Sequence, residues 1–494
     1  MVKSKKAVLE FYNSDFDGTL FPMETCRIII NHAYDDLVTY IEKIVDDRCQ
    51  EYCFLSQQVV YTSKPKQHLR RTKKLDPVAE FYLYHTCYKH RAIFNRSSKN
   101  NNRLSFGYAF SNGSAIPIND SFVEFNNEIQ RVKSKYAYHI QFDISSYFNS
   151  IYHHDLVNWF ARSKDINNQD VDLFGRFMRE INSGFSIDFL PHGIYPAKML
   201  GSHFLSYIDY SMLIKSESMI RFMDDFLISS NSKETVTKDF QIIQKLLGQK
   251  SLNINTHKTR LYNDVHEPVD VAVSEVVNNI FETITVYHGS DVGYECFEES
   301  IRELTNEEVR TLIALLDKPN ISGREASLVL DTIKKHTTEL HVYLPIFLHQ
   351  HPNLIKKVYS YCKYCTDKTE LAKEFVKLTS ENNYLNEFQL FWVAKILETY
   401  LLDTPQAGEL LELLYNHNDA TVISKAKILE IPEHRFGLPE LREIHLKNGS
   451  SGWLSWASAV GMRNDTKLVK NYLMDYFSKV SPINKLIGDC IKNI

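Results

Sequence analysis

The stretch from Met219 to Ser230, MIRFMDDFLISS, is the feature that most constrains how this chain folds. Two short runs of β-branched and aromatic residues flank the paired acids Asp224 and Asp225, and such runs are typical of buried strands. We therefore predict a β-hairpin with both carboxylates at its turn. Two adjacent acids in apolar surroundings repel each other unless a cation lies between them.

A third acid lies in a similar setting upstream, because Asp143 ends the apolar run in YHIQFDISSYFNSI. Three carboxylates on neighbouring strand ends form a hard-oxygen site suited to magnesium, and the carbonyl of Ile144 can face the same ion. Two such ions about 3.5–4 Å apart activate a 3′-hydroxyl and stabilise a leaving pyrophosphate. We predict Asp143, Ile144, Asp224 and Asp225 as ligands of two Mg²⁺ ions, with Mn²⁺ as an alternative ion.

Four stretches occur in the order of the motifs of a reverse transcriptase palm and resemble them. FDISSYF resembles motif A, LPHGIYPAKMLGS (190–202) motif B, FMDD (222–225) motif C and LNINTHKTRL (252–261) motif D. The resemblance implies a DNA polymerase palm that uses deoxynucleoside triphosphates, with Asp143, Asp224 and Asp225 as catalytic residues. It places Lys258 near the triphosphate, as a proton donor to pyrophosphate or a charge partner. An exposed lysine with no role is the alternative.

The same resemblance assigns nucleotide-binding residues. Phe148 matches the aromatic residue under the sugar, where a ring leaves no space for a 2′-hydroxyl, and plain core packing is its alternative. Gly193 lets the backbone approach a nucleotide because it has no Cβ. His192 stands where the family commonly has glutamine, which puts ordinary templating in doubt. Arg91 and Arg103 are the candidates for holding the triphosphate.

The most basic run of the chain, KPKQHLRRTKK, extends from Lys64 to Lys74. It is either a solvated loop or a surface that contacts phosphates. The chain as a whole carries a formal net charge of −4 and has a pI near 6.6. A protein that grips long nucleic acid through its phosphates is usually more basic, so we expect any such grip to be local.

A chain of 494 residues is longer than a single hydrophobic core usually accommodates, which favours two or three domains. We predict an α+β fold: reverse transcriptase fingers and palm with an N-terminal helical extension over residues 1–285, then an all-α domain over residues 286–494. In the latter, amphipathic helical periods separated by turn signals suggest HEAT-like repeats. An irregular helical bundle is the alternative.

The sequence has no apolar run of membrane-spanning length, and its N-terminus has no secretory apolar region. Eight cysteines in a chain this long do not form a disulfide framework. Cys362 and Cys365 have no second pair at zinc spacing, so we interpret them as buried or inert thiols. We expect a cytoplasmic protein with no membrane association.

Palm motifs with an altered motif B, no basic helical thumb after motif D and a long helical tail resemble the abortive infection (AbiK-like) reverse transcriptases of bacteria. The resemblance implies phage defence, a homo-oligomer, and template-independent DNA synthesis primed by a protein hydroxyl, with a single-stranded DNA product covalently attached to the chain. Tyr34 and Tyr40 are then candidate priming donors, because a phenol has a lower pKa than an aliphatic hydroxyl and more readily forms the attacking oxyanion.

Two other classes of function remain open at this point. One is a template-copying reverse transcriptase of the retron or group II intron kind, which predicts an RNA partner and a more basic surface. The other is a non-enzymatic scaffold in which the palm is a relic and the helical repeats bind a partner. Retention of all three acids speaks against the scaffold.

Overall fold

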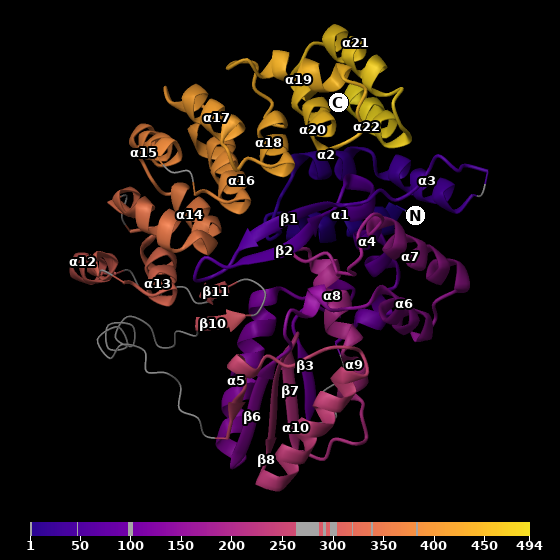
Figure 1. Ribbon diagram of the computed structural model, residues 1–494, viewed down its shortest axis with the longest axis vertical. Helices are drawn as coiled ribbons and strands as arrows, with labels where there is room; N and C mark the ends of the chain where they lie inside the picture. The colour runs from indigo at the N-terminus through magenta and orange to yellow at the C-terminus, as the bar shows by residue number, and fades with distance from the viewer. Residues whose placement is uncertain are drawn as a thin grey trace. The chain divides into compact units, whose positions relative to one another are not determined.

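The computed structural model describes residues 2–46, 48–96, 102–262, 286–289, 293–296, 304–318, 320–336, 339–381 and 384–494 (Figure 1). The chain divides into two compact units, each assembled from separate segments. The first unit contains residues 1–20, 41–57 and 72–268, and the second contains residues 21–40, 58–71 and 269–494. The expected division between residues 285 and 286 stays a prediction, because residues 263–285 lie outside the described part of the chain.

The first unit is built around a five-stranded sheet with the order β3-β7-β8-β6-β9. The strands are β3 (Arg103–Phe106), β6 (Tyr138–Asp143), β7 (Ser218–Phe222), β8 (Asp225–Ser230) and β9 (Arg260–Leu261). β3 runs parallel to β7, whereas the β7–β8, β8–β6 and β6–β9 pairs are antiparallel. The predicted hairpin is confirmed as β7 and β8, and β6 ends at Asp143 as predicted.

Helices cover both faces of this sheet. Successive side chains of a strand point to opposite faces of a sheet. On one face, Phe222 packs on Phe122 and Phe125 of α5 (Ile118–Lys135), with ring centroids 5.5 and 5.4 Å away. On the other face, the ring of Phe142 lies 5.1 Å from that of Phe240 in α10 (Lys233–Gly248). Double coverage explains why all of β7 is buried, as in sheets that have helices on both sides.

The remaining elements of this unit are mostly helical. They are α1 (Val2–Phe16), α4 (Pro77–Lys89), α6 (His153–Arg162), α7 (Asn168–Ile181), α8 (Tyr195–Phe204), α9 (Ser206–Asp209) and the hairpin strands β4 (Phe110–Ser111) and β5 (Ser114–Ala115). The N-terminal region is helical as expected. In α6, the Asp155 carboxylate accepts a hydrogen bond from Lys250 Nζ at 2.5 Å.

The second unit is almost entirely helical in its described residues. Its helices are α2 (Glu24–His32), α12 (Asn306–Ala314), α13 (Gly323–Ile333), α14 (Ile355–Cys362), α15 (Lys368–Glu381), α16 (Glu387–Ile396), α17 (Ala407–Asn416), α18 (Val422–Leu429), α19 (Leu438–Lys447), α20 (Trp453–Gly461), α21 (Lys467–Phe477) and α22 (Pro482–Asn493). Its strands include β10 (Val286–Gly289) and β11 (Gly293–Cys296), which form a hairpin. α3 (Tyr34–Val45) begins in this unit, and the unit boundary falls within it.

Most helices from α14 onward pack on the helix two places further along the chain. α14, α16, α18, α20 and α22 follow one another in this way, and so do the pairs α15–α17 and α19–α21 (Figure 1). Two parallel rows of helices are the arrangement of an α-solenoid. The identification of these rows as HEAT-like repeats stays a prediction.

The basic run from Lys64 to Lys74 forms part of a second, two-stranded sheet of β1 (Gln58–Ser63) and β2 (Leu69–Lys74). Its last two lysines are buried, which corrects the interpretation of the whole run as a solvated loop or phosphate surface. Lys74 pairs with Glu80 at 2.5 Å, and the Lys73 ammonium lies 3.1 Å from the ring centroid of Phe185. Buried cations of this kind stabilise the fold and are not available to phosphates.

Two further expectations concern the cysteines and membrane-spanning helices. Cys362 and Cys365 are both buried and free, as predicted, and burial raises the pKa of each thiol. Among the described helices, none is both long and apolar enough to cross a membrane.

Candidate active site

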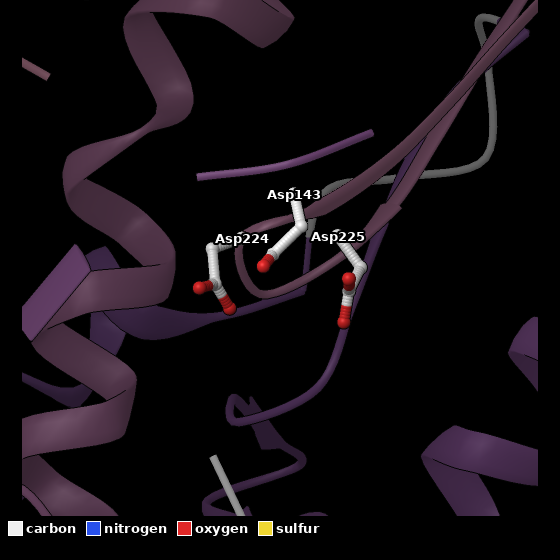
Figure 2. Close-up of side chains that lie close together, drawn as sticks. All are labelled: Asp143, Asp224 and Asp225. Atoms are coloured by element: carbon white, nitrogen blue, oxygen red, sulfur yellow. The ribbon is translucent and has the colours of Figure 1, made fainter. Parts of the chain in front are cut away.

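The three predicted acids meet at one end of the sheet. Asp143 ends β6 and lies opposite Asp225, the first residue of β8, in the antiparallel register. Asp224 lies in the two-residue turn that joins β7 to β8. One carboxylate oxygen from each lies within 4.8 Å of the others, and all three side chains gather around the turn (Figure 2). Among the described residues, this is the one group of His, Cys, Asp and Glu side chains close enough to hold a metal ion.

Burial makes this grouping costly without a counter-charge. Asp143 is 3% exposed and Asp224 is 2% exposed, so water screens their repulsion poorly. Three converging carboxylate oxygens are the ligand type that Mg²⁺ prefers. The donor set therefore fits a divalent cation, with Asp143, Asp224 and Asp225 as the side chains that would hold it.

The backbone around Ile144 shows where its carbonyl points. Asn255 N–H donates to the Asp143 carbonyl at 2.8 Å, and Ser145 N–H donates to the Asn253 carbonyl at 2.7 Å. Ile144 and Ile254 are thus an antiparallel pair without hydrogen bonds between them. The N–H and carbonyl of Ile144 consequently point away from Ile254, and metal ligation by this carbonyl stays a prediction.

The same backbone pairing brings Lys258 to the site. Its ammonium lies 3.0 Å from a carboxylate oxygen of Asp143, and its side chain is 43% exposed. Burial alone lowers the pKa of Lys258, but attraction by Asp143, Asp225 and Asp224 outweighs burial and raises that pKa above its ordinary value. Lys258 is therefore a cation whose charge faces the carboxylates and whose side chain is still open to solvent.

Arg221 supports the turn from inside the protein and was missed by the sequence reasoning. It is 1% exposed, and its guanidinium donates to both carboxylate oxygens of Asp209 and to the Ser202 carbonyl at 2.8 Å. It also donates to the Met223 carbonyl at 3.1 Å. Met223 has a positive φ of 57°, a conformation that costs energy for a side chain with a Cβ. An arginine within an apolar strand is the signal that indicates such a role.

Phe148 and His192 lie together as a packed pair. Their ring centroids are 4.8 Å apart in an edge-to-face arrangement, and both side chains are buried. Phe148 also lies against Gly201, where an added Cβ would come within 3.3 Å of its ring. The structure thus links motif A to motif B through these rings, and the sugar gate at Phe148 stays a prediction.

Gly193 has the positive φ of 107° that glycine tolerates best. A Cβ at this position would lie 2.5 Å from Leu20 Cδ1, so Leu20 fills the space beside the glycine. The His192 carbonyl next to it accepts from Thr72 Oγ1 at 3.0 Å. Gly193 therefore permits close packing in the structure, and its contact with a nucleotide stays a prediction.

The two arginines predicted to hold the triphosphate have local partners. The Arg103 guanidinium donates to the carbonyls of Asp209, Ser211 and Ile214 at 2.6–3.2 Å. These bonds hold Arg103 on backbone carbonyls, and its role as a triphosphate ligand stays a prediction. Arg91 is exposed, donates to the Tyr88 carbonyl at 3.2 Å and stacks on the Tyr88 ring. A role for Arg91 stays a prediction.

Comparison with known protein families identifies the domain that carries this site. Residues 91–303 match the family model described as "Reverse transcriptase (RNA-dependent DNA polymerase)", a span that contains all three aspartates and Lys258. The match covers less than half of the chain. The matched family consists of DNA polymerases, which are nucleotidyltransferases. No curated protein matches the sequence.

Solved structures that resemble the chain include two telomerases, both in complexes with a TWJ fragment of telomeric RNA. The Candida albicans telomerase has 13% sequence identity and a TM-score of 0.32, and the alignment covers 75% of this chain and 62% of that one. The Candida tropicalis telomerase has 12% identity and a TM-score of 0.28, with 83% and 64% covered. The chain thus spans less than two thirds of either telomerase. Because both TM-scores are low, the domain assignment depends on the family match and on the site.

Proposed function

We propose that this protein is a DNA polymerase that adds deoxynucleotides by nucleotidyl transfer at Asp143, Asp224 and Asp225. The observation that carries the proposal is the convergence of three carboxylates, one oxygen from each within 4.8 Å of the others, inside the span that matches the reverse transcriptase family. When bound, two Mg²⁺ ions supply Lewis acidity for the attacking hydroxyl and charge neutralisation for the leaving pyrophosphate.

The chain's own residues then have distinct tasks. The three carboxylates orient the reactants, because the register of β6 and β8 fixes Asp143 opposite Asp225. Lys258 is protonated and partly exposed beside Asp143, so it can donate a proton to the departing pyrophosphate or offset its charge. Phe148, held by His192, is proposed to exclude a ribose 2′-hydroxyl by contact.

We further propose that synthesis needs no template and starts on a hydroxyl of the protein, in an abortive infection system of the bacterial cytoplasm and in a homo-oligomer. Support comes from the family resemblance, from His192 in place of the motif B glutamine and from the net charge of −4. A net negative charge suits a chain that does not hold a long duplex. The product would then be single-stranded DNA bonded to the chain.

The exposure of the tyrosine side chains changes which tyrosine we propose as the primer. Tyr34 and Tyr40 are 6% and 4% exposed, and burial raises the pKa of Tyr34, which disfavours a phenolate nucleophile. Tyr152 follows Phe148 closely in the sequence and is 51% exposed, and Tyr210 in the same unit is 68% exposed. We therefore propose Tyr152 as the priming phenol, with Tyr210 as the second candidate.

The test is incubation of the purified protein with Mg²⁺ and a single labelled deoxynucleotide, without added nucleic acid. We expect the label to stay with the chain on a denaturing gel, and intact-protein mass to rise by whole nucleotide units. Tyr152→Phe should lose this modification, whereas Tyr384→Phe, which changes an 88% exposed tyrosine, should retain it. A product that forms only with an external primer and template contradicts protein priming.

A template-copying RNA-directed DNA polymerase is the second candidate. The description of the matched family, an RNA-dependent DNA polymerase, favours it. It predicts DNA whose sequence is complementary to a supplied RNA and whose yield depends on an annealed primer. Sequencing the product separates the two candidates, because untemplated synthesis gives a composition set by the nucleotides supplied.

A further inference from the structure

A cavity of about 250 Å³ lies on the sheet face that carries Arg221. Ser105 and Arg221 line it from neighbouring parallel strands, and Trp159, His203 and Asp209 line it from α6, α8 and α9. None of the three aspartates of the candidate active site belongs to the lining. The cavity is thus separate from the carboxylates, although Arg221 forms part of its wall and also holds the Met223 carbonyl.

The charged groups of the lining favour an anion. Arg96, Lys164 and Arg221 are cationic at neutral pH, whereas Asp209 is the one acid among the lining residues. Asp209 is paired with Arg221 at 2.6 Å, and Arg96 is paired with Glu124 outside the lining, so Lys164 carries the positive charge that these two acids do not offset. Burial also holds the pKa of His203 down, to about 4, which leaves its ring neutral. The three cations and the two acids paired with them leave one positive charge in excess, in a chain whose net charge is −4.

Hydroxyl groups and rings define the anion further. Four serines line the cavity, and of these Ser163 donates to the Trp159 carbonyl at 3.0 Å, so Ser105, Ser202 and Ser206 can donate to phosphate oxygens. Trp159, Tyr108 and Tyr210 offer aromatic surfaces, on which bases stack whatever their identity. At about 250 Å³ the cavity holds a single nucleotide unit and is too small for a duplex.

We propose that this cavity is a second nucleotide site, which binds a nucleoside phosphate independently of the catalytic metal. Cations and serines would hold the phosphate, and the rings would hold the base. The ligand is either a free nucleotide or one unit of a single DNA strand, since both present the same phosphate and base. The proposal goes beyond polymerase activity, because binding here needs neither the three aspartates nor Mg²⁺.

The test is equilibrium dialysis in EDTA with labelled dAMP, with a short single-stranded oligodeoxynucleotide and with inorganic phosphate. Excess EDTA removes divalent ions, and Asp224→Asn removes one charge of the catalytic site. We expect dAMP or the oligonucleotide to bind the wild-type protein and Asp224→Asn equally. The double variant Arg96→Gln/Lys164→Gln should bind at least tenfold more weakly. Lys238→Gln, which changes an exposed lysine on α10, is the matched control and should bind like the wild type.

The outcomes separate the sources and test the proposal. Binding of dAMP identifies the free nucleotide as the ligand, and binding of the oligonucleotide alone identifies the strand. Equal binding by the double variant and the wild type overturns the proposal, as does failure of both ligands to bind. Phosphate that binds as tightly as dAMP also overturns it, because the rings then contribute nothing. A chain inactive as a polymerase can still bind in this assay, so the two proposals fail separately.

Discussion

Substitution of Arg221 by methionine tests how the catalytic turn is held. The change keeps a long apolar stem of similar length and removes every donor. Five acceptor atoms then lose this partner: both carboxylate oxygens of Asp209, the Ser202 hydroxyl, and the carbonyls of Ser202 and Met223. Loss of one member of a buried ion pair typically costs about 3–5 kcal/mol, because the other charge stays buried and uncompensated. We expect a loss of this size in the free energy of unfolding.

Urea denaturation followed by tryptophan fluorescence measures the effect, with Trp392, Trp453 and Trp456 of the second unit replaced by phenylalanine so that Trp159 reports on the first unit. With a denaturant dependence of about 3 kcal/mol per molar urea, the midpoint should fall by roughly 1 M or more. Arg131→Met is the control. Arg131 is 51% exposed and pairs with Glu128 on the same helix, so its loss should cost less than about 0.5 kcal/mol.

The double variant Arg221→Met/Asp209→Leu completes the cycle. Replacing both partners by apolar groups leaves no unpaired buried charge, so part of the lost stability should return. Nucleotide addition should be lost both in Arg221→Met and in the double variant, because Met223 no longer has the hydrogen bond that holds its carbonyl. The reasoning is refuted if Arg221→Met loses less than about 1 kcal/mol or if the double variant loses the sum of the single losses.

Three further predictions address other parts of the chain. Lys258→Met should slow nucleotide addition by roughly 10²- to 10⁴-fold without lowering the unfolding midpoint, as single-turnover rates and denaturation curves will show. Phe148→Val should raise ribonucleotide incorporation relative to deoxynucleotide incorporation, and unchanged discrimination would place the gate elsewhere. Lys427 and Lys395 hold the pKa of Glu398 below its ordinary value of 4.5 although burial opposes them, so its contribution to stability is complete above pH 4.5 and disappears as pH falls through the lowered pKa. Acid unfolding of Glu398→Gln should accordingly depend less on pH than that of the wild type.

The part of the site that the sequence predicts correctly depends on local pattern. Apolar runs on either side of Asp224 and Asp225 determine a hairpin, and a strand that ends at Asp143 can pair with it in few registers. The acids therefore meet where the pattern alone places them.

The part that the sequence does not predict depends on partners distant along the chain. Arg221 meets Ser202 and Asp209 only because α8 and α9 pack on its face of the sheet. Arg103 and Lys73 look like surface cations in the sequence. In the fold, Arg103 donates to backbone carbonyls and the Lys73 ammonium lies over the Phe185 ring. No periodicity encodes such pairings, so basic residues are assigned to phosphate contacts more often than the fold allows.

The central claim is that Asp143, Asp224 and Asp225 together catalyse nucleotide addition with a divalent cation. The most direct measurement compares Mg²⁺-dependent incorporation of labelled deoxynucleotide by the wild type, Asp224→Asn and Glu234→Gln, with and without an added primer and template. Asp224→Asn removes one charge without changing shape, and Glu234→Gln removes an exposed charge in the same unit. We predict incorporation by the wild type and Glu234→Gln, and none by a folded Asp224→Asn. Incorporation by Asp224→Asn at the wild-type rate would contradict the claim.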